Sequence, residues 1–125
     1  MLSLAEQEIF ERYKHPVHAG VIEAADITAD GANQSCGDEV TLTLRLENGV
    51  VTEAKHQTRA CAVCTAAADL LCERAIGKTP EQLVATSTEE VADELGIPLS
   101  PVRLKCALLP LETVKQTVTN IPSDT

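Results

Sequence analysis

The segment Glu39–Glu47 restricts the fold more than any other part of the chain, because its apolar and polar residues alternate without a break. Such alternation is typical of a strand with one buried face and one solvent-facing side. Asn48-Gly49 follows directly, and this pair is preferred in the tight turn that joins two antiparallel strands. The return strand should run from Val50 to about Arg59, so the chain must contain an antiparallel hairpin. Its predicted inner face carries Val50, Ala54 and His56.

A third strand and a set of helices are expected around this hairpin. Val21–Thr28 is the expected third strand, and Asp30-Gly31 is expected to form a turn after it. Ser3-Leu4-Ala5-Glu6 is a capping box, which predicts a helix to about Lys14. The predicted buried side of that helix consists of Leu4, Ile9, Phe10 and Tyr13.

The sequence after Ala60 predicts helices. Cys61–Ile76 is mostly small or apolar, and Thr79 and Ser87 each begin a further capping box. The last helical region opens at Ser100-Pro101, and Pro110 predicts a break just after Cys106 because proline cannot donate to a carbonyl four residues back. The predicted fold class is α+β: a small antiparallel sheet of about three strands packed against several helices.

Length, charge and composition exclude several classes of function. The chain has 125 residues, which suit a single domain over positions 1–125. A net charge of −9, with one Tyr, one Phe and no Trp, disfavours both phosphate contacts and base stacking, so no nucleic-acid partner is expected. No apolar run approaches the roughly 20 residues of a membrane span, and the acidic N-terminal segment is unlike a signal peptide. The expected location is the cytoplasm.

Three short segments carry the chemistry, and each contains a cysteine. Cys36 is followed by Gly37 and Asp38, Cys61 lies at a predicted helix start that favours a thiolate, and Lys105 stands beside Cys106 as a stabilising cation or proton shuttle. Thiolates in a reducing compartment select zinc, cuprous copper or iron–sulfur clusters. Three Cys and one Asp are enough ligands for tetrahedral zinc or for the two irons of a [2Fe–2S] cluster.

The other two cysteines allow different interpretations. Cys72, beside Leu70-Leu71, is interpreted as a core residue. Cys64 lies one helical turn after Cys61, so it could be a further metal ligand, a resolving thiol or a core residue. A redox dithiol at Cys61 and Cys64 is disfavoured because that motif needs a different strand–helix context.

The three cysteine segments together resemble the scaffold proteins of iron–sulfur cluster assembly, the family of IscU, SufU and the NifU N-terminal domain. The resemblance rests on three stretches in order, with the second cysteine 25 positions after the first and the third 45 positions after the second, a spacing similar to IscU. These stretches are Asn33–Val40, Ala60–Val63 and Arg103–Leu109, and Tyr13–Gly20 resembles the family's N-terminal segment.

The resemblance implies a site and a set of partners. Cys36, Asp38, Cys61 and Cys106 would hold a nascent [2Fe–2S] cluster, iron or, in the protein as isolated, Zn²⁺. A cysteine desulfurase would deliver sulfur as persulfide to Cys106 or to a neighbouring residue, with Lys105 in an auxiliary role. Apo iron–sulfur proteins would receive the cluster, and the protein would be a carrier rather than an enzyme.

The subtype is open between two forms. Leu99–Arg103 resembles the segment of IscU proteins that an Hsp70-type chaperone grasps, and the long insertion of SufU-type proteins is absent. Lys105 instead of the His of IscU proteins favours a zinc-dependent sulfur acceptor similar to SufU. A zinc or redox-sensing module is a third alternative.

Overall fold

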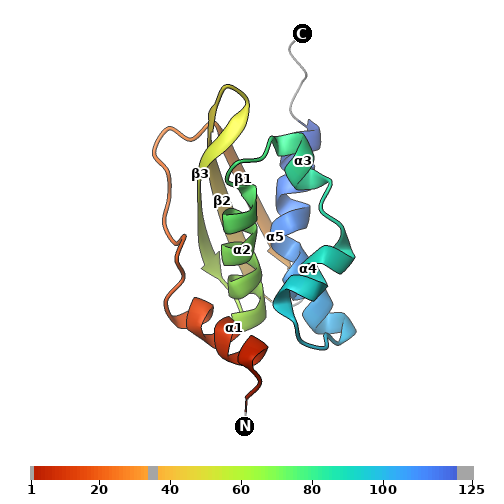
Figure 1. Ribbon diagram of the computed structural model, residues 1–125. Helices are drawn as coiled ribbons and strands as arrows, with labels where there is room; N and C mark the ends of the chain where they lie inside the picture. Colours follow the sequence, from red (N-terminus) through yellow and green to blue (C-terminus); the bar gives the residue numbers. More distant parts are fainter. Residues whose placement is uncertain (1, 34–36, 121–125) are drawn as a thin grey trace.

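The computed structural model describes residues 2–33 and 37–120. The elements follow the order α1 (Leu4–Lys14), β1 (Ile27–Asn33), β2 (Asp38–Glu47), β3 (Val50–Arg59), α2 (Ala62–Ala75), α3 (Pro80–Val84), α4 (Thr88–Leu95) and α5 (Pro101–Asn120). The three strands form an antiparallel sheet in the order β1-β2-β3. Figure 1 shows α2 and α5 packed along one face of this sheet, which confirms the predicted α+β class.

The hairpin of β2 and β3 forms as predicted. Asn48 and Gly49 both have positive φ, 54° and 78°, as a two-residue type I′ turn requires. The register shifts between Arg45 and Leu46, which brings Val51 opposite Leu46. The buried residue near the turn is therefore Val51, and the prediction that Val50 lies on the inner face is wrong.

The third strand lies later in the chain than predicted. β1 begins at Ile27, and Asp30-Gly31 lies inside it rather than in a turn. The segment before it is held by a side chain instead of by the ladder, because the N–H of Ile22 donates to Thr43 Oγ1 at 3.1 Å. This contact also buries Thr43, which the alternation had placed on the solvent-facing side.

Helix α1 starts at the predicted capping box but buries less surface than predicted. Ser3 and Glu6 cap each other's backbone N–H groups. Only Ile9 of this helix is buried, whereas Leu4 is 84% exposed and Phe10 and Tyr13 are about half exposed. The prediction that all four residues face the core is wrong, because α1 packs mainly against α2 and not into the sheet.

Helix α5 is continuous through Pro110, so the predicted break after Cys106 does not occur. Pro110 is buried against the other helices, and Leu109, Leu111 and Val114 around it all belong to the core. This packing offsets the loss of one backbone hydrogen bond. Cys106 therefore lies within a helix rather than at a junction.

The core lies between the sheet and the helices α2 and α5. Its central members are fully buried aliphatic side chains from both layers, namely Val40, Leu42, Leu44, Val51, Ala66, Ala68, Leu83 and Val114. The capping boxes at Thr79 and Ser87 are present, as predicted, at the starts of α3 and α4. Within the described part of the chain, no helix has the length and apolar character needed to cross a membrane.

A candidate metal centre

Cys61 is the N-cap residue of α2, as the sequence predicts. Its sulfur makes no capping hydrogen bond to the first turn of this helix. Its carbonyl accepts hydrogen bonds from both the N–H and the hydroxyl of Thr65, each at 3.0 Å. These two bonds fix the backbone at the point where the helix dipole favours a negative ligand.

Asp38 and Cys106 meet from opposite parts of the chain. Asp38 is the first residue of β2, and Cys106 lies in the second turn of α5. The thiol of Cys106 donates to Asp38 Oδ2 at 3.1 Å, and both residues are only 4% exposed. Burial, together with the hydrogen bond to Asp38 and the neighbouring Cys61, raises the pKa of Cys106 well above its usual range.

Asp38, Cys61 and Cys106 form one cluster. Each offers one ligand atom, and these atoms all lie within 4.8 Å of one another. The set contains two sulfurs and one carboxylate oxygen, and Cys61 is the member that reaches the surface. Thiolate sulfur with a carboxylate suits zinc or iron, and it leaves a coordination position open for a further ligand. Cys36 lies outside the described residues.

A close approach between strand and helix brings Cys106 to Asp38. A side chain at Gly31 in β1 would collide with Thr113 of α5: an added Cβ would lie 2.9 Å from Thr113 Cβ. Glycine at this position therefore lets α5 lie directly on β1. Asn33, the last residue of β1, pairs with Asp38, so the same strand end also positions the carboxylate.

The remaining predicted site residues take different places. Lys105 is exposed on α5, beside the buried Cys106. Cys64 is fully buried and is not among the three clustered ligand residues. Desolvation, with smaller contributions from Asp38 and Cys61, raises the pKa of Cys64 to about 12. Cys72 is 1% exposed, which agrees with its interpretation as a core residue.

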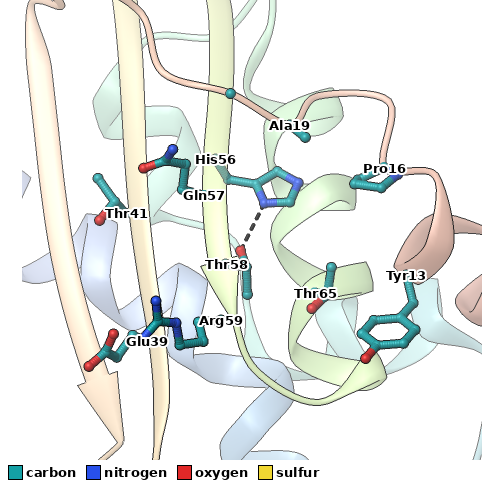
Figure 2. Close-up of a pocket in the computed structure, with 11 residues that line it drawn as sticks. Tyr13, Pro16, Ala19, Glu39, Thr41, His56, Gln57, Thr58, Arg59 and Thr65 are labelled. Carbon is teal, nitrogen blue, oxygen red and sulfur yellow. Dashed lines mark hydrogen bonds between the residues drawn. The ribbon is translucent and has the colours of Figure 1, made fainter.

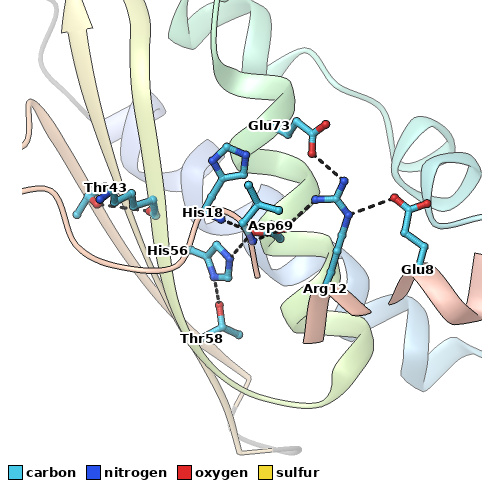
Figure 3. Close-up of polar contacts among 10 residues, drawn as sticks. Glu8, Arg12, His18, Thr43, His56, Thr58, Asp69 and Glu73 are labelled. Atoms are coloured by element: carbon cyan, nitrogen blue, oxygen red, sulfur yellow. Dashed lines mark hydrogen bonds and ion pairs between the residues drawn. The ribbon is translucent and has the colours of Figure 1, made fainter. Parts of the chain in front are cut away.

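A buried charged network lies on the other side of α2, and the sequence interpretation missed it (Figure 3). Asp69 is completely buried and accepts from Arg12 Nη1 at 2.7 Å and from His56 Nε2 at 3.1 Å. It also accepts from the N–H groups of Val17 and His18. Burial alone would raise the pKa of Asp69, but these hydrogen bonds hold it well below its usual range. The available signal was an aspartate, Asp69, within the mostly small or apolar run Cys61–Ile76.

An antiparallel sheet covered by helices on one face, with two thiols and a carboxylate converging at one end, defines a small protein that can hold a thiophilic metal. The model of the family described as "NifU-like N terminal domain" matches residues 4–125. The chain belongs to this family.

Relatives of known name support the same placement. The iron–sulfur cluster assembly scaffold protein IscU of Thermotoga maritima is 32% identical over an alignment of 118 positions, and the match covers 82% of this chain and 83% of the relative. The zinc-dependent sulfurtransferase SufU of Bacillus subtilis is 28% identical, with coverage of 93% and 90%. A crystal structure described as an iron–sulfur cluster assembly scaffold for the SUF system, from Fervidobacterium islandicum, is 28% identical with a TM-score of 0.75, covering 90% of this chain and 94% of that one.

Proposed function

We propose that this protein is a scaffold on which a [2Fe–2S] cluster is assembled before transfer to apo iron–sulfur proteins. The observation that carries the proposal is the convergence of Asp38, Cys61 and Cys106 within 4.8 Å at the end of the sheet. Cys36 is separated from Asp38 only by Gly37 and is the proposed fourth ligand. Gly37 has a φ of 73° and open space around it, so the backbone can approach a ligand closely.

Sulfur would arrive as persulfide from a cysteine desulfurase. The thiolate of Cys106 attacks the outer sulfur of the enzyme's persulfide, the S–S bond of the donor breaks, and the donor cysteine leaves as a thiolate. Cys106 must first lose its proton, and its hydrogen bond to Asp38 gives that proton an acceptor at 3.1 Å. Lys105 is the proposed auxiliary cation for this step, because it is exposed one residue away.

Cluster delivery is the step in which the segment Leu99–Arg103 takes part under this proposal. Its last three residues form the first turn of α5, and Val102 among them is 61% exposed, whereas Leu99 is partly buried against the core. An exposed apolar side chain such as Val102 is what an Hsp70-type chaperone can bind. The proposed place of action is the cytoplasm.

Anaerobic reconstitution tests the scaffold proposal. The reduced protein is incubated with ferrous iron, cysteine and a cysteine desulfurase, and iron and acid-labile sulfide are counted. We expect two of each per chain with visible absorbance, greatly reduced in Cys61→Ala and retained in the control Cys72→Ala. A colourless wild-type protein under these conditions would contradict the proposal.

The alternative function is zinc-dependent acceptance of persulfide, as the name of the SufU relative suggests. The donor set favours this alternative as well, since two thiolates and a carboxylate suit zinc. Under it, the zinc-loaded protein should increase the turnover of a cysteine desulfurase and form no stable cluster. Unchanged desulfurase turnover would exclude it. A redox module at Cys61 and Cys64 is disfavoured because burial raises the pKa of the Cys64 thiol to about 12, so that little of it is thiolate.

A further inference from the structure

A groove of about 610 Å³ lies at the edge of β3 that does not pair with β2, apart from the cluster of metal-binding side chains (Figure 2). None of Asp38, Cys61 and Cys106 lines it. Its size is that of a small-molecule site. The side chains that give it chemical character are His56, Thr58, Arg59, Tyr13 and Thr65.

His56 connects a hydroxyl in the groove to the buried carboxylate. Its Nε2 lies 3.1 Å from Asp69 Oδ1, and its Nδ1 lies 2.8 Å from Thr58 Oγ1. An ionised Asp69 can only accept, so Nε2 carries a proton, and in that tautomer Nδ1 is the acceptor for the Thr58 hydroxyl. Thr58, His56 and Asp69 therefore stand in the order of a nucleophile, its base and the carboxylate that orients the base.

Asp69 is held in place by groups that do not enter the groove. Arg12 Nη1 and the backbone N–H groups of Val17 and His18 bind its two oxygens at 2.7, 3.2 and 2.8 Å. His56 is itself only 2% exposed, and its backbone bonds His18 O and Gly20 N–H, both at 2.9 Å. The imidazole is thus fixed by its main chain and by a rigid carboxylate, as a preorganised base requires.

The backbone of Thr58 faces the same groove. The N–H and C=O of His56 bond to the segment His18–Gly20, so they point away from β2. Backbone direction repeats every two residues in a strand, and the register between β2 and β3 is unbroken here, so the N–H of Thr58 points to the free edge as well. A donor beside the hydroxyl is what stabilises an oxyanion formed on attack.

We propose that Thr58, His56 and Asp69 form an acyl-transfer site that hydrolyses small carboxylic esters. Thr58 Oγ bonds to the carbonyl carbon as His56 Nδ1 takes its proton, and the alcohol leaves with that proton. Water then attacks the acylated Thr58, passes a proton to His56, and releases the acid as the hydroxyl is restored. Thr58 and His56 are the catalytic residues, Asp69 is a positioning residue, and no redox partner is needed.

Reaction with a fluorophosphonate tests this proposal on the full chain. The reagent phosphonylates hydroxyls that have an adjacent base, and peptide mass mapping identifies the modified residue. We expect modification of Thr58, retained in Thr58→Ser and absent in Thr58→Val. His56→Gln keeps a donor for Asp69 but lacks the basic nitrogen, so it should slow the modification at least tenfold. The turnover of 4-nitrophenyl butyrate that depends on Thr58 is the wild-type rate minus the rate of Thr58→Val. This turnover should be retained in Thr58→Ser and reduced at least tenfold in His56→Gln.

Thr41 supplies the matched control. It lines the same groove, and its hydroxyl donates to Asp30 Oδ1 at 2.7 Å with no histidine between them. Thr41→Val should leave the modification of Thr58 unchanged. The proposal is overturned if wild-type protein stays unmodified, if Thr41 is modified as fast as Thr58, or if His56→Gln, with its circular dichroism unchanged, reacts at the wild-type rate.

Discussion

The Cys106 thiol donates a hydrogen bond to the Asp38 carboxylate at 3.1 Å, although the two residues are 68 positions apart in the chain. Both are buried, and Cys61 brings a second sulfur within 4.8 Å of them. The relationship has two consequences. The pair must give up a proton when a metal binds, and the carboxylate is the one hard ligand among soft ones.

Zinc binding should therefore strengthen as the pH rises. Burial raises the pKa of Cys106, so near neutral pH its thiol is protonated and metal binding releases that proton. For each proton released, the zinc-binding constant should rise by about tenfold per pH unit. Calorimetry in buffers of different ionisation enthalpy measures the number released, and Cys106→Ala should release about one fewer and bind zinc more weakly. An unchanged proton count would show that Cys106 is not a ligand.

Asp38→Ala should slow the release of an assembled cluster several-fold. A carboxylate is a weaker ligand for iron than a thiolate, so its removal leaves the cluster bound by the firmer sulfur ligands. The measurement is the rate of circular dichroism change as the cluster passes to an apo acceptor. Glu39→Ala, the exposed neighbour on β2, is the control and should transfer at the wild-type rate. Faster release from Asp38→Ala would refute this role for the carboxylate.

Asp69 should make the protein sensitive to acid. Its pKa in the folded state lies below the unfolded value of about 3.9. The stability it contributes is therefore complete above about pH 4 and is lost as the pH falls further toward the folded pKa. Asp69→Asn replaces the buried charged partner of Arg12 Nη1 by a neutral amide and should cost about 3 kcal/mol at pH 7, because a buried ion pair is broken.

Urea unfolding at pH 7 and at pH 3 measures this effect. The difference in unfolding free energy between the two pH values should be smaller in Asp69→Asn than in the wild type. Glu73→Gln is the matched control, since Glu73 also pairs with Arg12 but is 55% exposed. Its cost should stay below about 1 kcal/mol. Equal costs for the two substitutions would contradict the importance assigned to burial.

Gly31→Ala should weaken both the fold and the metal centre. The new methyl group would meet Thr113 of α5, so strand and helix must separate, at a cost of about 1–3 kcal/mol. Because α5 carries Cys106, the separation should also lower zinc affinity. Combining Gly31→Ala with Thr113→Ala removes the nearest opposing atom and should restore part of both losses, measured by thermal unfolding and zinc titration. Full wild-type stability of the single variant would contradict the close approach.

The parts of the fold that sequence predicts well are those determined by neighbouring residues. The hairpin at Asn48-Gly49, the capping boxes and the N-cap position of Cys61 depend on backbone preferences within a few residues. The start of β1 was predicted too early because Ile22 before it is buried as a strand residue would be, although its N–H donates to the side chain of Thr43 and not to a ladder carbonyl. Helix α5 continues through Pro110 because tertiary packing outweighs one missing bond.

In the candidate site, too, local features were predictable from the sequence and long-range contacts were not. The cysteine segments indicated metal chemistry, yet the contact between Asp38 and Cys106 depends on how α5 lies on β1, which no local pattern encodes. The network around Asp69 joins α1, α2 and β3, and its meaning emerges only when Arg12 and His56 reach the same carboxylate. Long-range pairs of this kind arise from the assembled fold.

The continuous helix α5 lacks one backbone hydrogen bond at Pro110. Because proline has no N–H, the carbonyl of Cys106 receives no hydrogen bond from the residue four positions ahead. The turns beside the proline are packed in the core, through Ala107 and Leu109 before it and Leu111 and Val114 after it, whereas Val102 in the first turn of α5 is exposed. The exposed first turn and Cys106 therefore lie on one helix, about one turn apart. A change in the position of that first turn would act on the hydrogen bond between Cys106 and Asp38, and so on the metal centre.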